Sequence, residues 1–174
     1  MFGTDAPIWA FLAAFGRGVD PFDLSQPTRI IETYPVLATI AFGWMLVDPD
    51  RSAGRLPKYN PARRKTFSLE DWTHVCRQLA GNLRANGAKQ LAEWVQTAAC
   101  KTEPVKSDQD QLDACICLIV AIHLAKSRDA LLVGNCSSGY IVVPDSQALR
   151  YELAIRCDEI GACRDGVHTA VSVR

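Results

Sequence analysis

The sequence predicts an α/β domain in which helices flank a mixed sheet and a helical hairpin is inserted. Three observations favour this class. A segment rich in β-branched residues, 28–34, leads directly into an apolar segment with a helical pattern. Two further helical patterns follow one another closely between residues 69 and 99. Two short apolar runs, 131–133 and 140–143, flank a glycine-bearing segment, which is typical of a β-hairpin or of a pair of short edge strands.

The N-terminal third is expected to contain one strand and two helices. Residues 6–15 are apolar and rich in alanine, which predicts a short helix. Thr28–Tyr34 predicts a strand that Pro35 stops. Proline suits a first helical position, so we expect the next helix over Val36–Trp44. The polar segment 47–65 contains three prolines and is expected to be an exposed loop.

Helix boundaries are marked best in the central third. Ser68 is a good N-cap, and Asn86-Gly87 is a typical helix end, so we expect a helix from about Leu69 to Ala85. A second helix over about Lys89–Ala99 follows at once. The two helices therefore predict an αα-hairpin.

A third long helix is expected to begin at Ser107, because Asp110 three residues later gives a capping-box pattern, and to reach about Lys126. An amphipathic segment over about 146–157 predicts the last helix. The tail that follows has weak patterning and is expected to fray.

These elements divide the chain into one domain, 1–159, and a C-terminal tail, 160–174. Within the domain, 47–100 is interpreted as an inserted loop and helical hairpin. The expected strands make a small sheet for so many helices, which suggests that further strands would precede Met1.

Composition restricts the possible functions. The 19 Lys and Arg residues balance the 19 Asp and Glu residues, so any basic surface must be local. Apolar runs are too short to cross a bilayer, and Met1–Asp5 lacks the basic residues of a signal peptide. We therefore expect a cytoplasmic protein with no membrane partner. The seven cysteines lack zinc-site spacing and are expected to be reduced.

Carboxylates crowd the start of the third long helix. Asp110 and Asp113 are three residues apart, so they share a helix face on which two carboxylates can bind one Mg²⁺ ion. The alternative is that they only stabilise the helix start, because acidic residues are common in a first turn. Asp113 directly precedes a buried run, so its carboxylate needs a partner or a metal.

Three segments, taken in order, resemble a predicted nuclease family of unknown function with an RNase H-like, RuvC-like fold. They are Arg29–Pro35, Tyr59–Ser68 and Ser107–Ala114. The resemblance implies that Glu32, Asp110 and Asp113 are catalytic residues and metal ligands. They would hold Mg²⁺ or Mn²⁺ for two-metal hydrolysis of phosphodiester bonds in DNA or RNA.

The second of these segments lies in a basic loop. Lys58, Arg63, Arg64 and Lys65 are expected to contact the phosphates of a nucleic acid, which basic side chains do without reading sequence. The alternative is an ordinary solvated loop.

One departure from the family leads to a second hypothesis. The family's opening strand, with its Gly-x-Asp pattern, has no counterpart here, so the chain resembles a member that lacks the N-terminal strands. It would then be a catalytically degenerate domain that binds nucleic acid or protein. An exposed sheet edge would favour a homodimer.

Overall fold

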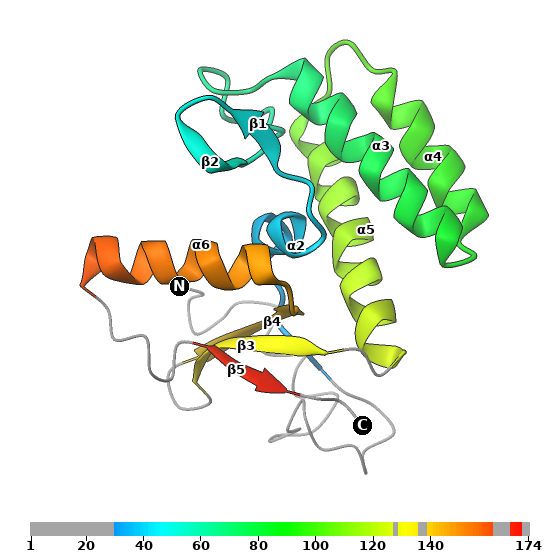
Figure 1. The fold of residues 1–174 in the computed structure, drawn as a ribbon. Helices are drawn as coiled ribbons and strands as arrows, with labels where there is room; N and C mark the ends of the chain where they lie inside the picture. Colours follow the sequence, from blue (N-terminus) through cyan, green and yellow to red (C-terminus); the bar gives the residue numbers. More distant parts are fainter. Residues whose placement is uncertain (1–29, 127–128, 136–138, 162–167, 172–174) are drawn as a thin grey trace, which may run out of the picture.

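The protein is described here from a computed structural model, which covers residues 30–126, 129–135, 139–161 and 168–171. The expected helix over 6–15 lies outside these residues. Within them the fold is mixed α/β (Figure 1). Its helices are α2 (Pro35–Ala41), α3 (Leu69–Ala85), α4 (Lys89–Ala99), α5 (Lys106–Ala125) and α6 (Gln147–Ile160). Its strands are β1 (Leu46–Asp48), β2 (Arg51–Arg55), β3 (Ala130–Asn135), β4 (Gly139–Pro144) and β5 (His168–Val171).

Two small antiparallel sheets are formed in the described part of the chain. β1 and β2 make a hairpin, and β3 pairs with β4 on one side and β5 on the other. The predicted hairpin over 131–143 is therefore confirmed. Residues 168–171 of the predicted tail do not fray but form β5, because they pair in register with β3.

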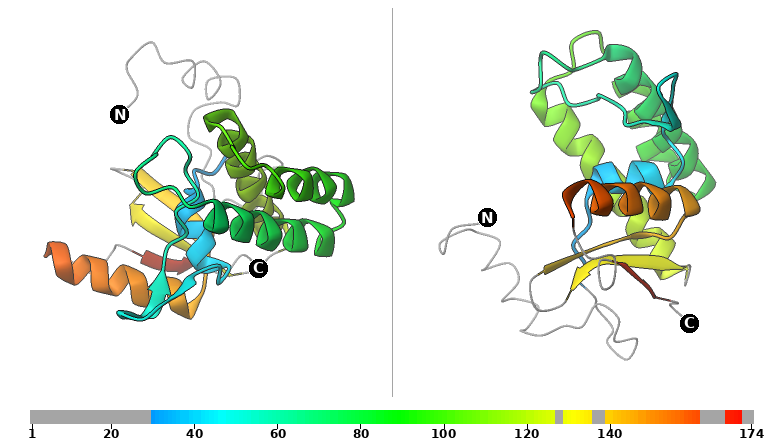
Figure 2. Two further views of the ribbon diagram at one scale, coloured as in Figure 1. Left: turned by 90° about the horizontal axis from the view of Figure 1, so that it is seen from above. Right: turned by 60° about the vertical axis from the view of Figure 1, so that its left-hand side comes forward.

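One face of the three-stranded sheet is covered by α2 and α6 (Figures 1 and 2). A cluster of buried apolar side chains joins these layers: Ile40, Leu131, Val143, Leu149 and Leu153. α6 begins where Ser146 Oγ accepts a hydrogen bond from Leu149 N, which is a typical N-cap.

A second hydrophobic core joins α3, α4 and α5. Trp72 is fully buried in it, and its indole N–H donates to Ala98 O at 2.9 Å, so the α3–α4 hairpin is tied by a polar contact as well as by packing. Both helices have the predicted bounds. Ser68 Oγ caps α3 by accepting from Asp71 N, as its position in the sequence predicts.

The start of α5 differs from the prediction. The helix begins at Lys106, so Ser107 lies inside it rather than at the N-cap. Asp108, not Asp110, supplies the capping carboxylate, since its Oδ2 accepts from Val105 N at 2.9 Å. The observed cap, Val105 with Asp108, therefore lies two residues before the expected one, Ser107 with Asp110.

The segment before α2 also differs. Residues 30–34 are not assigned to a strand, although Glu32 O accepts a hydrogen bond from Val142 N of β4 at 2.8 Å. α2 ends at Ala41, three residues early, because Gly43 takes a positive φ of 74° that stops the helix. The expected loop over 47–65 contains the β1–β2 hairpin, which was not predicted.

The sequence also led to expectations about membrane-spanning segments and disulfide bonds. Among them, every helix is too short or too polar to cross a membrane. The cysteines that they include are all free of disulfide bonds: Cys76, Cys100, Cys115, Cys117 and Cys157.

Candidate functional site

A cavity of about 660 Å³ opens where β2, α2, the start of α5 and the end of α6 meet. Its volume is in the range of sites that hold small organic ligands. Part of its wall is apolar and comes from α2 and the segment after β2, including Leu37, Ile40 and Leu56. The rest is strongly basic, with five cationic side chains in the lining: Arg51, Arg55, Lys58, Arg63 and Arg156.

Two of these arginines share one buried carboxylate. Glu152, on α6, is 1% exposed, and it accepts hydrogen bonds from Arg51 at 3.1 Å and from Arg156 at 2.9 Å. Two positive charges therefore face a single negative one, so this pairing leaves an excess positive charge at the cavity wall. The contact also fixes the β1–β2 hairpin against α6.

Asp71 fixes the third arginine and the loop that follows it. Its carboxylate is 1% exposed and accepts two hydrogen bonds from the guanidinium of Arg55, one of them 2.9 Å long. It also accepts from Lys58 N at 2.6 Å. Burial raises the pKa of Asp71, but these hydrogen bonds outweigh burial and hold the pKa below its ordinary value. The carboxylate therefore stays ionised and anchors the basic loop.

Lys58 and Arg63 supply the cavity's unpaired positive charge. Both side chains are exposed, and no carboxylate of the described residues forms an ion pair with either. Arg64 and Lys65 are exposed on the same loop but are not part of the cavity lining, as far as the described residues show. Of the four predicted phosphate contacts, two therefore lie in the cavity.

Asp113 lies in the cavity wall and is held by two donors. Tyr59 Oη donates to its Oδ1 and Gln109 Nε2 to its Oδ2, each at 2.9 Å. Burial raises the pKa of Asp113 above its usual value, although both hydrogen bonds act in the opposite direction. Burial and the adjacent carboxylate together raise the pKa of Tyr59, which keeps its hydroxyl protonated as a donor.

The other two predicted ligands lie elsewhere. Asp110 is exposed and pairs with Lys106 on its own helix. Glu32 is exposed and lies before α2, and neither residue is part of the cavity lining in the described chain. Across the described residues, no three His, Cys, Asp or Glu side chains are grouped closely enough to hold a metal ion. Glu32, Asp110 and Asp113 therefore do not form a three-carboxylate group for Mg²⁺ or Mn²⁺ in the described part of the chain.

Several residues that line the cavity or support its wall were missed by sequence reasoning. Asp71 reads as an ordinary first-turn residue of α3, and Glu152 and Arg156 as an exposed pair on α6. Tyr59, at the start of the second of the three resembling segments, is 4% exposed and serves as a donor to Asp113. One signal was present in the sequence: an acidic residue that periodicity assigns to the buried face of a helix needs a cationic partner.

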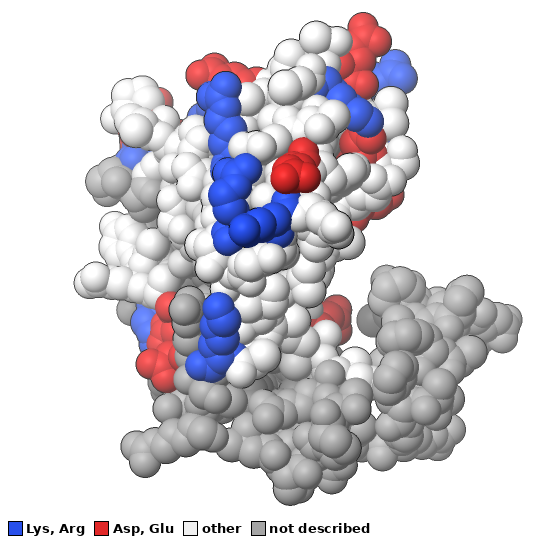
Figure 3. All heavy atoms as spheres, turned by 90° about the vertical axis from the view of Figure 1, so that its right-hand side faces the viewer, with Lys and Arg blue, Asp and Glu red and all other residues white. Residues whose placement is uncertain are grey.

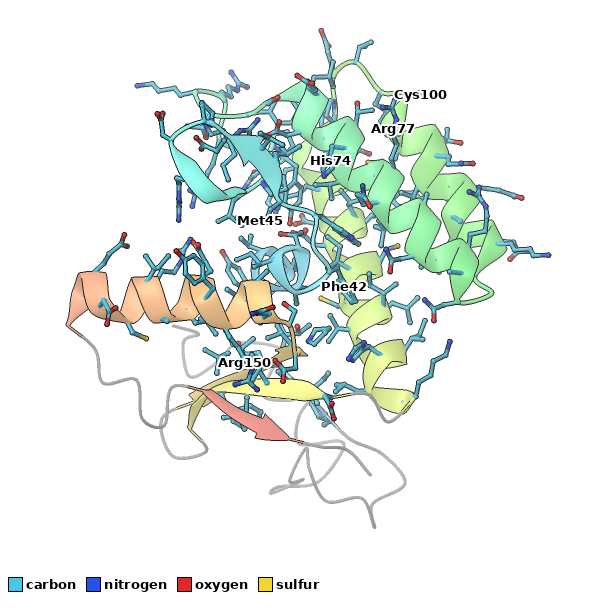
Figure 4. The ribbon with its side chains drawn as sticks, viewed as in Figure 1. Phe42, Met45, His74, Arg77, Cys100 and Arg150 are labelled. Atoms are coloured by element: carbon cyan, nitrogen blue, oxygen red, sulfur yellow. The ribbon has the colours of Figure 1, made fainter. Side chains whose placement is uncertain are left out.

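A second, shallower cavity of about 470 Å³ lies against α3 and includes His74 and Arg77, both labelled in Figure 4. His74 Nε2 lies 3.1 Å from Trp44 O, so the imidazole is engaged in joining α3 to the segment before β1. This cavity lacks the group of cations found in the first one.

Comparison of the chain with protein-family models, with characterised proteins and with solved structures found no match. The chain is therefore classified by its fold and its cavity alone. It is a mixed α/β protein with a cationic cavity that one half-buried carboxylate adjoins.

Proposed function

We propose that this chain binds nucleic acid through the phosphates of its backbone at the cationic cavity. The observation that carries the proposal is the excess of positive charge in the lining. The lining contains five cations and one carboxylate, Asp113, and the buried carboxylates behind the wall, Asp71 and Glu152, are each already paired with arginine. Side chains of this kind attract phosphate without reading base sequence.

The charge is local, which agrees with the neutral chain as a whole. Lys58 and Arg63 carry exposed ammonium and guanidinium groups on a loop that Asp71 holds in place. A loop anchored in this way loses little conformational freedom when it binds, so its cations are more effective than those on a free chain.

The experiment is fluorescence anisotropy with labelled single-stranded and duplex DNA and RNA. The double variant Lys58→Ala/Arg63→Ala should bind about tenfold more weakly than the wild type, since two phosphate contacts are lost. The matched control is Arg84→Ala/Lys89→Ala, which removes two exposed cations from the α3–α4 hairpin. Figure 3 shows the side of the molecule that carries this hairpin, and both basic and acidic side chains are exposed on it. Equal loss of affinity in both double variants would contradict the proposal.

Hydrolysis of the bound nucleic acid is a second candidate, favoured by one observation. Asp113, a predicted catalytic carboxylate, lies in the same cavity as Lys58 and Arg63. The same oligonucleotides are therefore incubated with Mg²⁺ or Mn²⁺, using the wild type and Asp113→Asn. Cleavage by the wild type that the variant has lost would support a nuclease, whereas binding without cleavage would support the binding module alone.

A further inference from the structure

The cationic cavity combines three chemistries that one ligand would have to match. Its basic side chains suit an anion, and its apolar wall from α2 and the Leu56-Pro57 segment suits a flat or aliphatic body. Tyr34 also lines it, with 49% of its surface exposed, so one aromatic ring is open to stacking. A nucleotide has all the matching parts, namely a phosphate, a sugar and a planar base.

Asp113 adds a requirement for hydrogen-bond donors. Each of its oxygens accepts one hydrogen bond, from Tyr59 and Gln109, whereas a carboxylate has about four lone-pair sites. As far as the described residues show, half of its accepting capacity is therefore unused. A half-buried carboxylate with unused lone pairs favours a ligand that brings N–H groups.

Gln109 provides an independent observation of the same kind. This side chain is 7% exposed, and its amide oxygen is buried without a hydrogen-bond partner among the described residues. The amide nitrogen is already committed to Asp113. The acceptor beside Asp113 is thus short of a donor, and buried acceptors of this kind are uncommon in folded proteins.

Among the common bases, guanine presents two adjacent N–H donors, at N1 and N2, on one edge. A carboxylate can accept both at once, whereas adenine, cytosine and uracil each offer fewer donors on that edge. We propose that the cavity receives one unstacked guanine nucleotide, with Asp113 accepting from the base, Tyr34 stacking on it, and Lys58 and Arg63 holding its phosphate. This inference rests on the proposed binding of nucleic acid and specifies which base enters the cavity.

The experiment is calorimetric titration of the full chain with GMP, IMP, AMP and ribose 5-phosphate. GMP should bind at least about tenfold more tightly than AMP, the discrimination expected of a bidentate base contact. IMP, which lacks the N2 amino group, should fall between them. Ribose 5-phosphate should bind most weakly, because it lacks the base.

Two variants test whether Asp113 is responsible for the preference for GMP over AMP. Asp113→Asn should bring the GMP and AMP affinities together, because the amide replaces one acceptor oxygen with a donor. Asp110→Asn, an exposed residue on the same helix, is the matched control and should keep the wild-type ratio. The comparison among ligands uses the wild type alone, so it holds even where a variant folds poorly.

The results distinguish the guanine site from the proposed binding of nucleic acid through phosphates. Equal affinities for GMP, AMP and ribose 5-phosphate would overturn the guanine site while leaving phosphate binding intact. Oligonucleotide binding without any mononucleotide binding would also overturn it. Oligonucleotide binding that does not depend on Lys58 and Arg63 would instead overturn the proposed function.

Discussion

Asp110 and Asp113 lie three residues apart on α5, yet their environments differ sharply. Asp110 is exposed and pairs with Lys106, whereas Asp113 is half-buried against Tyr59 and Gln109. Sequence spacing predicted a shared helix face, which is correct for the backbone, but it could not predict which side chain the cavity would receive. That outcome depends on Tyr59, which is 54 positions away in the chain.

Asp71 anchors both Arg55 and the loop that follows β2, so we expect its substitution to destabilise the fold. Asp71→Asn should lower the free energy of unfolding by about 2–3 kcal/mol at neutral pH, because it removes the counter-charge of Arg55 and weakens the anchor of Lys58. This value is below that for a fully buried pair, because a third of the Arg55 side chain is exposed and solvent screens the charge. Urea denaturation measures the difference.

The pH dependence of that difference has a definite sign. The folded-state pKa of Asp71 lies below its ordinary value of 3.8, so the ion pair contributes fully above pH 3.8. Its contribution should decline as the pH falls through the folded-state pKa. Asp110→Asn is the control and should change stability by less than about 0.5 kcal/mol, because its ion pair is exposed. Equal effects of both variants at neutral pH would contradict the assignment.

At the scale of elements, the sequence was most informative where helix ends carry local signals. Ser68 caps α3, and Asn86-Gly87 follows its last residue, so α3 and α4 have the predicted bounds. The β1–β2 hairpin was missed because its strands are short and include Gly54, which has low strand propensity. The turn sequence Asp48-Pro49-Asp50 was the available signal, since Asp48 Oδ1 accepts from Asp50 N.

Gly54 gives a test of how the hairpin supports the cavity. It has a φ of 80°, and a Cβ there would lie 2.5 Å from Leu46 O, a backbone atom of the paired strand. We expect Gly54→Ala to cost about 1–3 kcal/mol and to weaken oligonucleotide binding, because β2 carries Arg51 and Arg55. Thermal unfolding and anisotropy measure the two effects.

A matched glycine is available in α3. A Cβ on Gly81 would meet nothing within 4 Å, so Gly81→Ala should raise stability by about 0.5–1 kcal/mol and leave binding unchanged. If Gly54→Ala were as well tolerated as Gly81→Ala, the close approach of Gly54 to Leu46 O would be contradicted.

At the scale of the whole molecule, the cavity lies where two hydrophobic cores meet. Tyr59 belongs to the core of α3, α4 and α5, whereas Ile40, Leu37 and Leu56 belong to or pack against the core between α2, α6 and the sheet. The sequence alone could not predict this meeting. The Arg51–Glu152 contact, for example, joins residues 101 positions apart, and no local pattern determines such a pair.

The predicted homodimer also belongs to this scale and stays a prediction. In the described chain, one edge of the three-stranded sheet is partly engaged, because Val142 N of β4 donates to Glu32 O. The RNase H-like fold and the metal site likewise stay predictions. What the fold supports directly is a cavity with an excess of cations.

The measurement that tests this central claim most directly is the salt dependence of binding to single-stranded DNA. The dependence of log Kd on the logarithm of the salt concentration is measured for the wild type. The same measurement is made for Lys58→Ala/Arg63→Ala and for Arg84→Ala/Lys89→Ala. Loss of two phosphate contacts should reduce the magnitude of the slope by about 1.4 in the cavity variant, because each contact contributes roughly 0.7. The control variant should keep the wild-type slope. An unchanged slope in Lys58→Ala/Arg63→Ala would contradict binding of nucleic acid at this cavity.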